Sequence, residues 1–192
     1  MRVLAVDDGS FYSGLPDKRR GKTLLIGAIV SDFKIERLLL STIEVDGLDA
    51  TEKLINMVKR SQEAIDLILL PSISCGGFNL IDAAQIYEIL KTPLLVINRE
   101  EPNDARVEQA LRNHFPDWKE RLAIITHVGH PKKLILDESW TLFFHVFGMS
   151  QSMVSPLLRE MTIFGQIPEP LRVAQILVRG LSKEKSNDII SC

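Results

Sequence analysis

The sequence predicts an α/β fold in which a mixed β-sheet is flanked by helices. Near the N-terminus, a short β-branched run is followed by two strands that are joined closely enough for an antiparallel meander. The later strands are continuous apolar runs, which is typical of strands covered on both faces by helices. In the second part of the chain strands alternate with helices, and this order predicts crossover helices within the sheet.

Each element has its own signal. The predicted strands are Arg2–Val6, Thr23–Ser31, Lys34–Val45, Asp66–Ser72, Pro93–Asn98 and Trp140–Gly148. The predicted helices are Ala50–Ser61, a segment from Asn79 or Asp82 to about Leu90, Asp104–Phe115, Ser150–Thr162 and Pro168–Leu181. Asp49 and Glu52 have the spacing of a capping box at the start of the first helix. Residues 10–22 read as a loop, whereas residues 118–131 have no clear pattern.

The composition is that of a globular domain. The 192 residues are 45% hydrophobic and 25% charged, which predicts one domain over residues 1–192 with a frayed tail at 182–192. The formal charge of −2 excludes a global positive field, so any nucleic-acid binding has to be local. Cys75 and Cys192 fit neither a disulfide framework nor a metal-binding pattern. We expect a cytoplasmic protein, since carboxylates follow the N-terminus too soon for a signal peptide or membrane span.

Two acidic clusters stand at predicted strand ends. Asp7 and Asp8 follow the first strand, and Asp46 and Asp49 follow the third. If neighbouring strands carry them, their oxygens converge in the way that Mg²⁺ or Mn²⁺ requires. Acidic residues are also common in turns and helix caps, and this second interpretation stays open.

A glycine-rich turn follows the predicted strand 66–72. Gly76, Gly77, Phe78 and Asn79 lie where open α/β sheets bind ligands, and their backbone amides are candidates for holding a phosphate group. A plain tight turn is the alternative, because the segment lacks the glycine fingerprint of nucleotide-binding loops. Cys75 is a candidate nucleophile only if a histidine lies beside it.

The segment Gln166–Ala174 has the pattern of a helix start. Its two prolines suit the first helical turn, and Glu169 complements the helix dipole. Arg172 is a candidate to bind a carboxylate or a phosphate group.

Four segments together carry a resemblance to a known family. Val6–Phe11, Glu44–Glu52, Gly76–Asn79 and Ile167–Ala174 resemble the archaeal family called domain of unknown function 99, which is itself similar to endonuclease V. The resemblance covers nearly the whole chain. It implies a three-layer, ribonuclease H-like sheet, with Asp7 in the place of the first metal-binding aspartate of endonuclease V.

The sequence also departs from that pattern. Where endonuclease V has a second aspartate after its fourth strand, this chain has Pro71-Ser72. The Tyr-Ile-Pro wedge and the strand glutamate of endonuclease V are absent, and Gln175 stands where relatives often have histidine. These departures argue against endonuclease V activity on inosine, because fold similarity does not transfer chemistry when site residues differ.

Three functions follow as hypotheses. The first is a protein that binds nucleic acid or a nucleotide, with its metal-dependent phosphodiesterase activity lost or altered, in which Lys18, Arg19, Arg20 and Arg172 are candidate phosphate contacts. The second is an active nuclease that uses Mg²⁺ or Mn²⁺. The third is a structural or interaction domain whose acidic turns only cap helices.

Overall fold

The computed structural model describes residues 1–9, 21–138 and 140–188, and its main feature is a seven-stranded sheet. The strands of this sheet are β1 (Arg2–Asp8), β2 (Lys22–Ser31), β3 (Lys34–Glu44), β4 (Leu67–Leu70), β7 (Leu94–Asn98), β8 (Lys132–Ile135) and β9 (Thr141–Phe147). A separate hairpin is formed by β5 (Ser74–Cys75) and β6 (Asn79–Leu80). The helices are α1 (Ala50–Ser61), α2 (Ala83–Leu90), α3 (Asp104–His114), α4 (Trp118–Val128), the short 3₁₀ helix η1 (Gln151–Met153), α5 (Val154–Met161) and α6 (Glu169–Asp188).

The sheet is mixed, with the strand order β3-β2-β1-β4-β7-β9-β8. β1, β4 and β7 are parallel neighbours, whereas β2 and β3 on one side and β9 and β8 on the other pair antiparallel. The carboxyl ends of β1, β4 and β7 therefore meet at one edge of the sheet, which is where open α/β sheets bind ligands.

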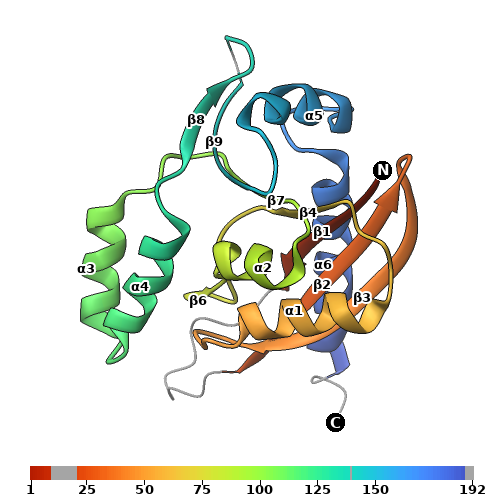
Figure 1. Ribbon diagram of the computed structural model, residues 1–192. Helices are drawn as coiled ribbons and strands as arrows, with labels where there is room; N and C mark the ends of the chain where they lie inside the picture. The colour runs from red at the N-terminus through yellow and green to blue at the C-terminus, as the bar shows by residue number, and fades with distance from the viewer. Residues whose placement is uncertain (10–20, 139, 189–192) are drawn as a thin grey trace.

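Helices cover both faces of the sheet, so the molecule has three layers (Figure 1). Alternate residues of each central strand point to opposite faces. On one face, Leu4 and Ile68 pack with Leu54 of α1 and Ile86 of α2. On the other face, residues such as Ala5 and Leu69 pack with Leu158 of α5 and Ala174 of α6. α3 and α4 lie beyond β7, at the left of Figure 1.

The structure confirms the predicted α/β class and corrects several boundaries. α1 has the predicted bounds, whereas the predicted helix Ser150–Thr162 is divided into η1 and α5. α6 continues to Asp188, so its backbone is helical through most of the tail that was expected to be frayed. The unassigned residues 118–131 contain α4, and β8 and the β5–β6 hairpin were missed. In the described part of the chain, none of the helices is long and apolar enough to cross a membrane.

Candidate functional site

The carboxyl end of β1 places Asp8 against the glycine-rich turn. The carboxylate of Asp8 accepts a hydrogen bond of 2.8 Å from the backbone N–H of Gly76. Burial raises the pKa of Asp8, and the bond from Gly76 opposes this rise. Asp8 therefore links β1 to the turn that follows β4.

Asp7 has a pKa far above the usual value for an aspartate. Burial raises its pKa to about 6, against the opposing backbone hydrogen bond from Asp8. The negative charge of Asp8 raises this pKa further, and the positive charge of Arg179 lowers it. A carboxyl group with such a pKa exchanges its proton close to neutral pH, which is a property found at functional sites.

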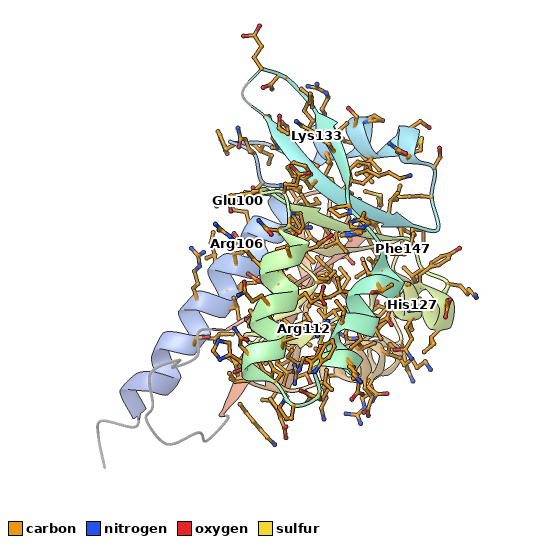
Figure 2. All side chains as sticks on the ribbon, turned by 90° about the vertical axis from the view of Figure 1, so that its left-hand side faces the viewer. Glu100, Arg106, Arg112, His127, Lys133 and Phe147 are labelled. Carbon is orange, nitrogen blue, oxygen red and sulfur yellow. The ribbon has the colours of Figure 1, made fainter. Side chains whose placement is uncertain are left out.

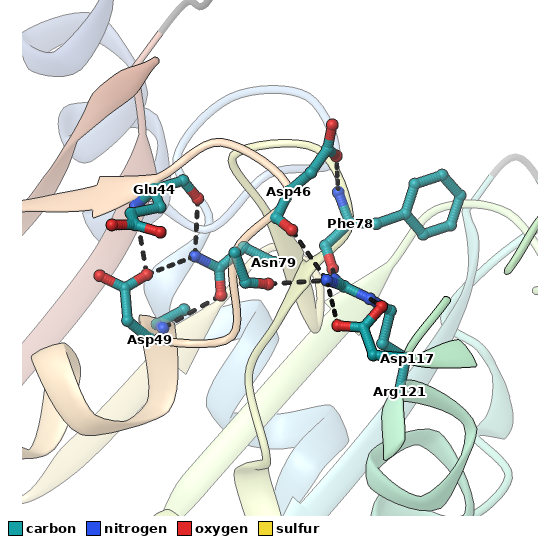
Figure 3. Close-up of polar contacts among 9 residues, drawn as sticks. Glu44, Asp46, Asp49, Phe78, Asn79, Asp117 and Arg121 are labelled. Atoms are coloured by element: carbon teal, nitrogen blue, oxygen red, sulfur yellow. Dashed lines mark hydrogen bonds and ion pairs between the residues drawn. The ribbon is translucent and has the colours of Figure 1, made fainter. Parts of the chain in front are cut away.

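Asp46 and Asp49 hold neighbouring loops together (Figure 3). The Asp46 carboxylate accepts a hydrogen bond of 2.9 Å from the backbone N–H of Phe78. The Asp49 carboxylate accepts one from the Glu44 backbone N–H at 3.1 Å and one from the Asn79 side chain at 2.7 Å. Each carboxylate thus has a structural role of its own.

The predicted capping box at α1 is wrong. Asp49 makes no side-chain cap hydrogen bond, and the Glu52 carboxylate accepts from Asn56 instead. The buried side chain of Asn79 takes over the cap, because its Oδ1 accepts a hydrogen bond of 3.0 Å from the Ala50 backbone N–H. The cap comes from a residue 29 positions away in the sequence, which a local pattern cannot reveal.

The glycine-rich turn contains two residues with left-handed backbone. Gly76 has φ 52° and Gly77 has φ 83°, values that favour glycine. The N–H groups of Gly76 and Phe78 already donate to Asp8 and Asp46. These two amides are therefore engaged within the protein, which argues against the predicted phosphate cradle.

The fit of a divalent cation to these acids is poor. Among the described residues, no group of three or more His, Cys, Asp or Glu side chains could hold a metal ion. Mg²⁺ takes about six oxygen ligands in near-octahedral geometry. At least one carboxylate oxygen of each of three acids, Asp8, Asp46 and Asp49, already accepts a hydrogen bond from the protein. These acids therefore do not form a preorganised metal site.

A buried arginine that sequence analysis missed connects the same loops. Arg121 of α4 donates to the backbone carbonyls of Asp46, Gly47 and Phe78 at 2.8, 3.0 and 2.5 Å. Its guanidinium also forms a two-point ion pair with Asp117, one turn earlier in α4 (Figure 3). A signal was present, since the spacing Asp117 to Arg121 is that of a helical ion pair.

A cleft of about 1000 Å³ lies at the carboxyl ends of β4 and β7. Its walls come from the segment after β4, from the segment between β7 and α3, and from α6. Arg99, Arg106 and Arg179 line it, and no ion pair within the described part of the chain involves any of the three. Figure 2 shows Arg106 on α3, with Glu100 in the segment that precedes this helix.

The cleft also contains negative charge. Glu100, Glu101 and Asp104 line it together with the arginines. Asp104 lies 3.0 Å from the ring of His130, so part of this charge is paired when that ring is protonated. The cleft is therefore of mixed charge, with arginines on more than one wall.

Comparison with known proteins places the chain in a family. A family model described as Endonuclease dU matches residues 1–182. The chain belongs to the Endonuclease dU family. An archaeal relative named UPF0215 protein, from Thermococcus gammatolerans, is 35% identical over 188 residues, which are 97% of this chain and 94% of the relative. The matched model carries this description rather than the name domain of unknown function 99.

Solved structures confirm the predicted fold. The crystal structure of a protein of unknown function from Archaeoglobus fulgidus has a TM-score of 0.78 at 33% identity, covering 92% of this chain and 95% of that one. Endonuclease V of Ciona intestinalis, solved with a 24mer DNA that contains inosine, has a TM-score of 0.58 at 12% identity, covering 98% of this chain and 87% of that one. The latter likeness concerns the fold alone.

In this member of the Endonuclease dU family, the residues that differ from the endonuclease V pattern or from its relatives lie at the cleft. Pro71, Ser72 and Gln175 all line it. Cys75 is buried, its thiol donates to the Asn79 carbonyl, and burial raises its pKa well above the usual range. These properties do not suit a thiolate nucleophile. The cluster Lys18-Arg19-Arg20 lies outside the described residues.

Glu169 and Arg172 form a pair within α6. The Arg172 guanidinium contacts both carboxylate oxygens of Glu169, which confirms that Arg172 is paired with an acid. The hydrogen bond from Arg172 lowers the pKa of Glu169. Neither residue lines the cleft, so their geometry supports a helix-start role.

Proposed function

We propose that this protein binds single-stranded nucleic acid or a nucleotide in the cleft, with its metal-dependent phosphodiesterase activity lost or altered. The observation that carries the proposal is the presence of Arg99, Arg106 and Arg179 around one cleft, none of them ion-paired within the described residues. Arginine binds phosphate groups without reading the base sequence, and the cleft lies where α/β sheets bind ligands.

The acidic residues favour binding over cleavage. Asp7 and Asp8 would be the first ligands of a Mg²⁺ or Mn²⁺ ion, but Asp8 is bound to Gly76 and Pro71 stands where a second aspartate was expected. Such an ion supplies a nucleophilic hydroxide and stabilises charge on phosphorus. With an acidic ligand missing, we expect both effects to weaken by orders of magnitude in rate.

An active divalent-metal-dependent nuclease is the second candidate. The description of the matched family, Endonuclease dU, favours it. So does Asp7, whose pKa of about 6 suits proton exchange near neutral pH. A structural domain is the third candidate, and the engagement of Asp46 and Asp49 in loop contacts favours it.

One pair of measurements separates the three functions. We expect the purified protein with Mn²⁺ to leave inosine-containing strands intact on a denaturing gel. In fluorescence anisotropy, we expect it to bind oligothymidylate of about 12 nucleotides, with an affinity that falls as salt rises. Arg179→Gln should weaken this binding by about threefold to tenfold, because it removes a phosphate contact.

The control variant is Lys133→Ala, which removes a charge from β8 outside the cleft (Figure 2). It should bind like the unaltered protein. Incision of an inosine or deoxyuridine strand that Asp7→Asn abolishes and Lys133→Ala retains would establish the active nuclease instead. If the protein neither binds nor cuts these strands, the structural domain is the function that remains.

A further inference from the structure

The two outermost strands of the sheet differ in how their free edges are protected. β3 and β8 stand at the two ends of the strand order, so in the described part of the chain one edge of each has no neighbouring strand (Figure 1). β8 has four residues, and two of them are Lys132 and Lys133. β3 has eleven residues, and its centre from Leu38 to Thr42 carries no charge. Because short length and lysines are what usually prevents a free edge from pairing, the centre of β3 is open to another strand.

β3 also exposes apolar side chains on one face of the sheet. Ile35 and Leu38 pair with residues of β2 whose side chains pack toward α6, and the alternation along the strand adds Leu40 to this face. α6 lies over β1 and β2, and these three side chains of β3 are 49%, 39% and 61% exposed. Neighbouring apolar side chains that remain exposed on one surface are typical of an interaction site.

The two ends of β3 carry opposite free charges. Lys34 begins the strand and Glu44 ends it. Neither forms an ion pair with another of the described residues. The charged residues between them, Glu36 and Arg37, form ion pairs within the chain. The strand therefore has a positive end and a negative end that are both available to a partner.

An antiparallel copy of the same strand matches the apolar centre and the two ends. A twofold axis at Leu39 puts Leu38 of each copy opposite Leu40 of the other. The same axis brings Lys34 of each copy beside Glu44 of the other, since both lie five residues from the centre. The bulge in β3 moves the lysine by about one residue, or about 3.3 Å, which its flexible four-carbon side chain can span.

We propose that two copies of this chain form a dimer through β3, in which the two sheets join edge to edge. Backbone hydrogen bonds hold the two edge strands together, and the apolar side chains become buried between the copies. Lys34 and Glu44 fix the antiparallel direction. The dimer is a property beyond the function proposed above, because no residue of β3 lines the cleft.

The first test is the mass of the purified full chain in solution. Sedimentation velocity over about 1 to 100 µM protein should show a species with twice the 21.6 kDa of one chain, increasing with concentration. Leu40→Lys should raise the Kd of the dimer at least about tenfold, because it places a charge in the apolar centre of both strands. The matched control is Ile135→Lys, which alters a side chain that is 66% exposed on β8, the opposite edge strand. It should leave the Kd unchanged.

The second test reverses the charges at the ends of the strand. Lys34→Glu and Glu44→Lys should each raise the Kd of the dimer by about threefold to tenfold, because each puts like charges side by side at two places in the dimer. The double variant should return the Kd to that of the unaltered protein, since it restores both pairs with their signs exchanged. A parallel or shifted pairing would not give this recovery.

The contrary outcomes are equally specific. A chain that stays monomeric up to about 100 µM overturns the proposal. A dimer with the same Kd in Leu40→Lys also overturns it, because the contact then lies elsewhere. The melting temperature of Leu40→Lys shows whether it folds, and if it does not, the charge reversals decide. A double variant that dimerises as weakly as the single variants overturns the antiparallel arrangement.

Discussion

At the scale of single residues, Asp7 combines a position near the carboxyl end of β1 with a cost in stability. Its pKa rises from 3.8 to about 6 on folding, chiefly through burial. The unfolded chain therefore loses this proton at lower pH than the folded chain does. Stability falls as the pH rises from about 4 to about 6, and the full cost is present above that range.

We predict that Asp7→Asn stabilises the protein at about pH 7.5 by about 1 to 2 kcal/mol, a value reduced for the partial solvent exposure of the carboxylate. At about pH 3 the variant and the unaltered protein should have similar stability, because Asp7 is then largely protonated in both states. Urea unfolding at the two pH values measures this difference. The exposed acid Glu138 provides the control, since Glu138→Gln should change stability little at either pH. A loss of stability in Asp7→Asn at about pH 7.5 would contradict the burial argument.

At the scale of elements, the turn between β5 and β6 depends on one close contact. Gly77 has φ 83°, and a Cβ atom there would lie 2.3 Å from a carboxylate oxygen of Asp46. That oxygen accepts the Phe78 N–H, so a side chain at position 77 disturbs the bond between two loops. Gly165 also has positive φ, 65°, but nothing lies within 4 Å of its Cβ position.

We predict that Gly77→Ala destabilises the protein by about 1 to 3 kcal/mol more than Gly165→Ala does. Both variants carry the strain of a left-handed alanine, and only the first also displaces Asp46. Urea unfolding of the two variants gives the difference directly. Equal losses in the free energy of unfolding would mean that the closeness of Asp46 to position 77 has no effect on stability.

The elements also show how far the sequence alone could lead. The apolar strands and the amphipathic α1 were predicted to within about three residues at each end, because their burial follows a simple period. α4 was missed because, among its residues, the buried side chains are Arg121 and Val128, so its inner face is not apolar. Asp7 and Asp8 were expected at a strand end and lie there. Their partners were not foreseen, because Asp8 and Gly76 are 68 positions apart.

At the scale of the whole molecule, Arg121 ties three distant segments into one corner. Its guanidinium donates hydrogen bonds to the loop after β3, to the turn before β6 and to Asp117 at the start of α4. Replacing it would remove the hydrogen bonds that Arg121 donates to three backbone carbonyls and to the Asp117 carboxylate. Removing Arg121, the buried partner of this ion pair, is strongly destabilising, because the three carbonyls lose their donor and the partly exposed Asp117 loses the positive charge beside it.

We predict that Arg121→Met lowers the free energy of unfolding by about 3 to 5 kcal/mol. The matched control is Arg112→Met, because Arg112 also pairs with an acid one helical turn earlier but is exposed. It should cost less than about 1 kcal/mol. Urea unfolding with both variants tests this, and a cost for Arg121→Met as small as that of the control would refute it.

The position of Arg121 along the chain also sets an order of events during protein synthesis. The carbonyls of Asp46 and Gly47 are made 75 and 74 residues before the arginine that binds them. At about 5 to 20 residues per second, they wait roughly 4 to 15 s for their donor. During that time β1, β2, β3 and α1 can already pair and pack, whereas the corner that Arg121 holds cannot close. The corner that Arg121 holds is therefore completed after the part of the sheet that α1 covers.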